Sequence, residues 1–158
     1  FKIPDPYIPK VGARIMSLQE PDKKMSKSDD NVNSWIAILD SRDDIIRKFK
    51  RAVTDSDSRV IMSEDKPGVS NLITIYSAVT GKTVAEIERE FEGRGYGEFK
   101  LAVGEAVADE LAPIKQKHDE IIKDKGELER LYKAGAQKAE YTARRTYLKA
   151  MKKVGFVL

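Results

Sequence analysis

Hydrophobic residues recur at intervals of three or four from residue 41 onward, which is the spacing of one face of an amphipathic helix. The pattern predicts helices that start at Ser41, at Pro67 and at Thr83, with Gly81 ending the second of them. Glu86, three residues after Thr83, completes a capping-box pattern. These local signals make helix the dominant predicted element.

The second half of the chain carries further helical patterns. A glycine-rich break at 93–97 precedes a long predicted helix, in which Pro113 is expected to produce a kink. Its apolar stripe consists of Phe99, Val103, Val107, Leu111, Ile114, His118 and Ile121. Another helical segment begins at Gly126, and Gly135 is expected to interrupt it. A last helix is predicted from Ala136 to about Val154, with Ala136, Ala139, Ala143, Tyr147 and Ala150 on one side.

Residues 1–40 show a different pattern. Three prolines within the first nine residues favour an extended chain. Short apolar runs at 13–18 and 35–39 predict strands, as does a later run at 59–62. The sequence KKMSKSDDN, residues 23–31, lies between the first two runs and is therefore predicted to be a loop. The expected fold is mainly α, a helical bundle with a short β edge.

Charge is distributed unevenly along the 158 residues, although the net charge is only +3. Residues 132–158 hold seven Lys or Arg against one acidic residue, a net charge of +6, which leaves −3 for residues 1–131. Four of these basic residues fall on one side of the last predicted helix: Lys138, Arg145, Lys149 and Lys152. Three interpretations stay open for that side: a solvated face, contact with an acidic surface, or contact with RNA phosphates.

Composition excludes some classes of site. The chain has no cysteine, which rules out disulfides and thiolate metal sites and favours the cytoplasm. No apolar run approaches the ~20 residues of a membrane span. The chain starts with Phe1 in the middle of a proline-rich stretch, so we expect a piece of a longer protein.

Two short motifs have ordinary structural explanations. The sequence VTGKT, residues 79–83, ends like a phosphate-binding P-loop, but Tyr76 stands where that motif requires glycine. A helix stop followed by an N-cap explains these residues better. His118 is the single histidine and lies on an apolar stripe, which is typical of a core or boundary residue rather than a ligand or base.

The loop at 23–31 has the clearest chemistry. Lys24 and Lys27 are three residues apart, and Ser26 and Ser28 flank the second lysine. Such a loop could close over a polyphosphate, with the two ammonium groups directed at separate oxygens and the hydroxyls bonding others. A lysine-rich surface loop is the alternative, and the spacing alone does not separate the two.

Residues 24–28 read KMSKS, which matches letter for letter the signature of class I aminoacyl-tRNA synthetases. The context GARIMSLQEPDKKMSKSDDN, AVTDSD, KPGVSNLITIYS and EGRGYGEFK resembles the bacterial type of tryptophanyl-tRNA synthetase over the whole chain. The tyrosyl enzymes are less similar, because their bacterial members usually have a less exact signature and a further RNA-binding domain.

The resemblance implies an enzyme that activates tryptophan with ATP, releases pyrophosphate and charges tRNA(Trp). Lys24 and Lys27 would be the catalytic residues, stabilising charge on the departing pyrophosphate. The residues that contact ATP would be Ile15, Lys24, Met25, Ser26, Lys27 and Ser28. Mg2+ would accompany ATP without a dedicated protein site, and no prosthetic group is implied.

One departure limits this expectation. The family's His-x-Gly-His type motif is absent, since His118 is the single histidine. We therefore expect the C-terminal portion of the synthetase, inactive without a missing N-terminal catalytic half. The expected domains are an edge of the catalytic domain with the KMSKS loop (1–40), a helical anticodon-binding domain (41–125) and helices packed back on the catalytic domain (126–158).

The partners follow from the same resemblance. The intact enzyme is expected to be a homodimer, the piece is compatible with a monomer, and no membrane is involved. The alternative function is a stand-alone helical tRNA-binding module without catalysis.

Overall fold

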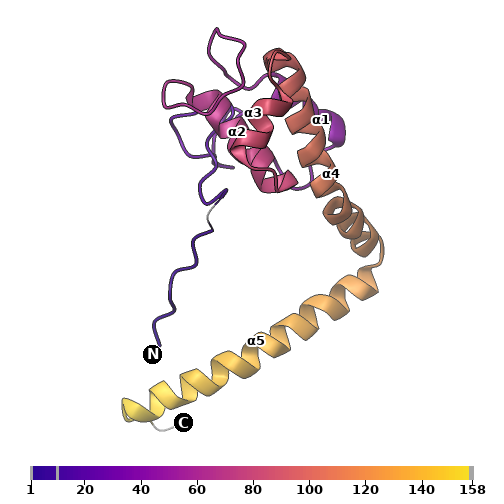
Figure 1. Cartoon of the computed structure of the whole chain (residues 1–158). Coiled ribbons are helices and arrows are strands. Elements are labelled where there is room, and N and C mark those ends of the chain that lie inside the picture. Colours follow the sequence, from indigo (N-terminus) through magenta and orange to yellow (C-terminus); the bar gives the residue numbers. More distant parts are fainter. Residues whose placement is uncertain (1, 10, 157–158) are drawn as a thin grey trace. The chain divides into compact units, whose positions relative to one another are not determined.

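The computed structural model describes residues 2–9 and 11–156, which belong to two compact units, Phe1–Lys115 and Gln116–Leu158. The helices are α1 (Arg42–Lys50), α2 (Pro67–Thr80), α3 (Val84–Glu90), α4 (Gly95–Lys123) and α5 (Lys125–Lys153). Figure 1 shows α2 and α3 side by side, next to the first turns of α4. The predicted mainly α fold is confirmed. The predicted divisions at residues 40 and 125 stay a proposal.

Three aromatic rings form the centre of the first unit. Tyr76, Phe91 and Phe99 come from α2, from the end of α3 and from α4, and their ring centroids lie 4.9–6.1 Å apart. Ile45 and Phe49 bring α1 into the same cluster, each only 1% exposed. Each such buried side chain stabilises the fold by ~1.5–3 kcal/mol.

The predicted helix boundaries follow from local hydrogen bonds. The hydroxyl of Ser41 accepts from the Asp44 backbone at 3.1 Å, and the Thr83–Glu86 capping box is complete. Gly81 ends α2 with a φ of 74°, a conformation that only glycine adopts easily. The structure therefore confirms that VTGKT is a helix stop followed by an N-cap.

The predicted strands were wrong. Within the described residues, the structure has one isolated antiparallel bridge, between Met16 and Lys24, and no strand. A strand requires a longer ladder of backbone bonds, and here side chains bond part of the backbone that such a ladder would use. The backbone of Met16 bonds the side chain of Asn71, and the amide of Met62 donates to a carboxylate oxygen of Glu88 at 2.8 Å.

The second unit differs from prediction in the continuity of its helix. Asp124 caps α5 through its carboxylate, and α5 runs through Gly135 without a break. No residue of α5 is buried, including those on the alanine side of the predicted last helix. In the first unit, Ile114 of the predicted apolar stripe is 50% exposed, whereas Phe99, Val103 and Val107 are buried as expected.

Within the described part of the chain, none of the helices is both long enough and apolar enough to span a membrane.

Candidate functional site

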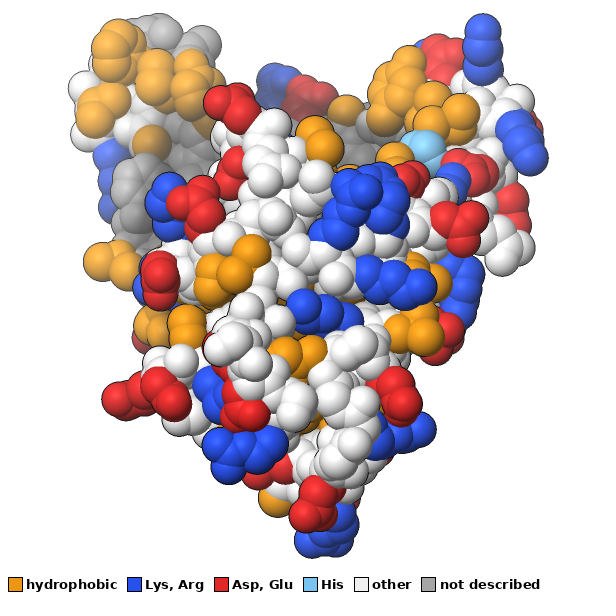
Figure 2. All heavy atoms as spheres, turned by 90° about the horizontal axis from the view of Figure 1, so that it is seen from above, with side chains coloured by type: hydrophobic (Ala, Val, Ile, Leu, Met, Phe, Trp, Pro, Cys, Tyr) orange, Lys and Arg blue, Asp and Glu red, His pale blue; other side chains and the backbone are white. Residues whose placement is uncertain are grey.

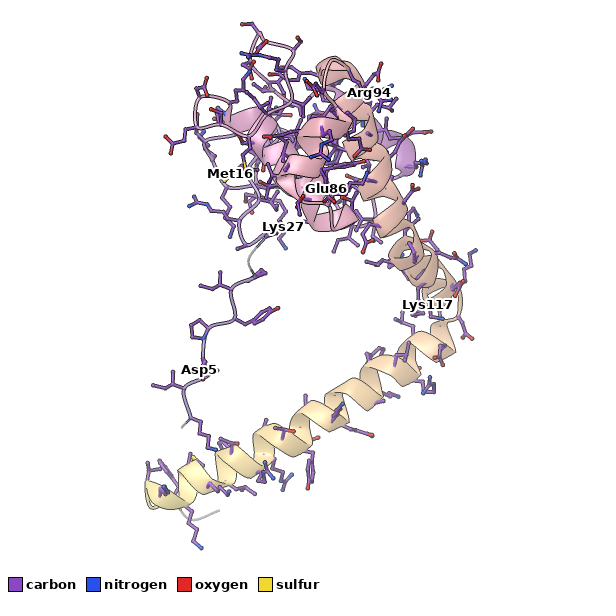
Figure 3. All side chains as sticks on the ribbon, viewed as in Figure 1. Asp5, Met16, Lys27, Glu86, Arg94 and Lys117 are labelled. Carbon is purple, nitrogen blue, oxygen red and sulfur yellow. The ribbon has the colours of Figure 1, made fainter. Side chains whose placement is uncertain are left out.

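The KMSKS segment, residues 24–28, is an exposed loop of the first unit, as predicted. The side chains of Lys24, Ser26, Lys27 and Ser28 are exposed, while Met25 is partly buried against the hydrophobic core. In Figure 3, Met16 and Lys27 lie on the same side of the first unit, beside its helices. The polar groups of the segment are thus available to a ligand, while Met25 anchors the segment to the core.

Backbone bonds join the start of the KMSKS segment to the run that precedes it. The amide of Met25 donates to the carbonyl of Ile15 at 3.0 Å, and the amide of Ser17 donates to the carbonyl of Lys23 at 2.8 Å. Met16 and Lys24 are therefore directly opposite each other. This arrangement brings Ile15 and Met25, both predicted to contact ATP, next to each other.

Ser26 organises the turn inside the segment. Its hydroxyl accepts from the amide of Ser28 at 3.2 Å, and its carbonyl accepts from the amide of Asp29 at 3.2 Å. The carboxylate of Asp29 in turn accepts from the amide of Asn31 at 2.8 Å. These bonds are all local, so the turn can change shape without disturbing the core.

The three neighbouring lysines differ in their electrostatic partners. Lys23 forms an ion pair with Glu20, which raises the pKa of Lys23. Among the described residues, the ammonium groups of Lys24 and Lys27 have no hydrogen bond or ion pair. In the view of Figure 2, Lys and Arg side chains are interspersed with Asp and Glu. Lys24 and Lys27 can therefore bind an anion without first breaking an internal pair.

A buried lysine holds the chain that leaves the loop. Lys48 is only 5% exposed, and its ammonium group lies 2.6 Å from a carboxylate oxygen of Asp40 and 3.1 Å from the carbonyl of Trp35. The same ammonium group lies 5.0 Å from the centre of the Trp35 ring. Sequence reasoning missed Lys48, although its spacing from Ile45 places it on the apolar face of α1.

A second charged cluster ties the turn at 55–57 to α2 and α4. The Lys66 ammonium group lies 3.0 Å from Asp55, 2.9 Å from Asp57 and 3.0 Å from the Tyr96 hydroxyl. Hydrogen bonds with Tyr96 and with both carboxylates raise the pKa of Lys66. The Lys66 ammonium group likewise lowers the pKa of Asp57 well below its usual range. The sequence did not reveal this cluster, because no periodicity brings the four residues together.

The remaining candidates do not form part of this loop. His118 is partly exposed, with its Nδ1 atom 3.0 Å from an oxygen of Asp119. On α5, Lys138, Arg145, Lys149 and Lys152 are all exposed. Among the described residues, no group of three His, Asp or Glu side chains is placed to hold a metal ion.

Comparisons with known proteins agree on one family. The model of the family "tRNA synthetases class I (W and Y)" matches residues 1–112. Tryptophan–tRNA ligase of Clostridium acetobutylicum is 54% identical over 158 residues, which is 100% of this chain and 47% of that protein. The corresponding ligase of Wolinella succinogenes is 47% identical over 157 residues, which is 99% of this chain and 48% of that protein.

A solved structure has the same fold. The tryptophanyl-tRNA synthetase from Mycoplasma pneumoniae matches with a TM-score of 0.81 at 30% sequence identity, covering 94% of this chain and 45% of that chain. This chain therefore spans about half the length of the curated relatives it matches.

Proposed function

Since the chain belongs to the class I tRNA synthetases of the tryptophan and tyrosine family, we propose that it is the C-terminal portion of a tryptophan–tRNA ligase. That enzyme activates tryptophan with ATP, releases pyrophosphate, and transfers the tryptophanyl group to tRNA(Trp) with release of AMP. The observation that carries the proposal is the KMSKS segment on an exposed loop, with two lysines that have no partner among the described residues.

Lys24 and Lys27 are the proposed catalytic residues. During activation the tryptophan carboxylate attacks the α-phosphorus of ATP, and negative charge moves onto the departing pyrophosphate. Two ammonium groups on a closing loop stabilise that charge, and the hydroxyls of Ser26 and Ser28 bond further oxygens. Catalysis then rests on positioning and electrostatics, without a covalent enzyme intermediate.

Ile15 and the backbone around Met25 are proposed to line the adenine side of the ATP site. The hydrogen bond from the Met25 amide to the Ile15 carbonyl supports this assignment, because it holds the two residues next to each other. Mg2+ enters as part of the ATP substrate and is bound mainly through its phosphates and water.

The helical part of the chain is proposed to contact tRNA(Trp). Residues 41–125 would form the anticodon-binding domain and residues 126–158 would pack on the catalytic half. The basic side of α5 would then contact either RNA phosphates or an acidic surface of that half. The intact enzyme is proposed to be a cytoplasmic homodimer.

A chimera tests the proposal. The chain replaces the matching segment of the Clostridium acetobutylicum ligase, and tryptophan-dependent exchange of pyrophosphate into ATP is measured with tyrosine as the control amino acid. We expect exchange with tryptophan only, and none from the chain alone. A folded chimera that exchanges no pyrophosphate would contradict the proposal.

A second candidate function is a helical tRNA-binding module without catalysis, which the exposed basic residues of α5 favour. Binding of the chain to tRNA(Trp) and to an unrelated tRNA, at low and moderate salt, distinguishes the cases. A preference for tRNA(Trp) that survives added salt favours the module. Weak binding that collapses equally for both tRNAs indicates general electrostatics.

A further inference from the structure

We propose that Asn71 is a positioning residue for the KMSKS segment, acting through the backbone of Met16. Asn71 is in α2, 55 positions away from Met16 in sequence, and only 6% exposed. Its side-chain oxygen accepts from the Met16 amide at 2.9 Å, and its side-chain nitrogen donates to the Met16 carbonyl at 2.8 Å. The catalytic consequence rests on the proposed function, whereas the positioning itself does not.

The two bonds imitate the pairing of neighbouring strands. A carboxamide presents a donor and an acceptor side by side, as a strand residue does with its own N–H and C=O. Met16 is thus flanked on both sides, by Asn71 and by Lys24, the first residue of the KMSKS segment. A helix residue therefore takes the place of a neighbouring strand and determines where Lys24 lies.

No other described side chain bonds both backbone groups of Met16. Leu18, two residues further along, is held differently: its amide donates to the Ser34 carbonyl, and its carbonyl accepts from the Val53 amide. Losing the Asn71 carboxamide would leave two backbone groups of Met16 without partners in a partly buried place, which favours a shift of residues 15–17. The bond from Met25 to Ile15 would be the first to weaken.

Amide hydrogen exchange in this chain tests the positioning directly. Asn71→Asp keeps the size and the acceptor but replaces the donor, and Asn71→Leu removes both groups. We expect exchange of the Met25 amide to rise by about tenfold or more in both variants, relative to the Ile73 amide, which reports the opening of α2. The Met16 amide should show the same rise in Asn71→Leu, which removes its acceptor. Tyr96→Phe is the matched control, because it removes hydrogen bonds to Lys66 and Asp55 in the same unit.

Two results would overturn the positioning role. One is unchanged protection of the Met25 amide in a folded Asn71 variant, and the other is an equal rise in Tyr96→Phe. If neither Asn71 variant folds, the wild-type chain still decides the question. The Asn71 side-chain amide protons should then exchange slowly and show a nuclear Overhauser effect to Met16. Fast exchange without that effect would contradict the contact.

Catalysis is tested in the chimera described above. Asn71→Asp should raise the KM for ATP and lower kcat for pyrophosphate exchange, by about tenfold in kcat/KM, with the KM for tryptophan unchanged. Equal changes in both KM values would indicate general destabilisation and overturn the catalytic part. An inactive wild-type chimera would count against the proposed function. Amide hydrogen exchange in this chain would still test the positioning role of Asn71.

Discussion

Replacing Gly68 by alanine should destabilise the first unit strongly, because the helix start has no room for a side chain. A Cβ atom at Gly68 would lie 2.2 Å from the Val53 carbonyl oxygen and 3.1 Å from the Val53 carbonyl carbon. Ordinary contacts start near 3.4 Å, so α2 and the Val53 backbone must separate by about 1 Å. Backbone atoms, unlike a flexible side chain, cannot rotate away from the new methyl group.

We expect Gly68→Ala to lower the free energy of unfolding by about 3 kcal/mol, at the upper end of overpacking costs. The displacement would also strain the bond from the Val53 amide to the Leu18 carbonyl, now 2.8 Å long. For a slope of about 2 kcal/mol per molar urea, the urea midpoint should fall by about 1.5 M.

Trp35 provides the assay. It is the single tryptophan and lies in the first unit, so its fluorescence during urea unfolding does not report on α5. Gly97→Ala, in α4, is the matched control, since the space around a Cβ atom at this position is open to 4 Å. That variant should be neutral or more stable by up to about 1 kcal/mol. A Gly68→Ala midpoint within error of the wild type, or an equal loss in Gly97→Ala, would refute the reasoning.

Three further predictions concern the stability of the same unit. Lys48→Met should lower the free energy of unfolding, measured with urea, by about 2 kcal/mol, because the Asp40 side chain, 19% exposed, loses its partner. The exposed control Lys50→Met should change it by less than about 0.5 kcal/mol. Asp57 has a lowered pKa in the folded state, so the unfolded chain binds more protons and stability should fall as pH drops below about 4. The urea midpoint of Lys66→Met should depend less on pH, between about pH 7 and pH 3, than the midpoint of the wild type. An equal pH dependence would contradict this prediction. Thr83→Ala should lower the free energy of unfolding by about 1 kcal/mol, because it removes the N-cap of α3. Thr83→Ser, which keeps the hydroxyl, should unfold thermally close to the wild type.

Local signals predicted the helices because their causes are local. Ser41, Gly81 and Thr83 act within a few residues of themselves, and each has its predicted role in the structure. The strand prediction at 13–18 failed for the opposite reason. The partner of Met16 is Asn71, a contact across 55 positions that no pattern near Met16 announces.

The candidate site shows the same division. The KMSKS segment was predicted as a loop with available cations, and the structure places it on the surface with Lys24 and Lys27 exposed. The spacing could not tell which of Lys23, Lys24 and Lys27 is neutralised, because the Lys23–Glu20 pair depends on the turn geometry. Lys48 could have been suspected, since a lysine beside Phe49 on the apolar face of α1 needs a buried partner.

The central claim is that Lys24 and Lys27 bind the triphosphate during tryptophan activation, and one measurement tests it most directly. The single-turnover rate of tryptophan activation is compared in the chimera for wild type, Lys27→Ala and Lys23→Ala. We predict that Lys27→Ala lowers the rate about 10²-fold, equivalent to ~3 kcal/mol in the transition state, while Lys23→Ala leaves it unchanged. An unchanged rate in Lys27→Ala, or an equal loss in Lys23→Ala, would contradict the account.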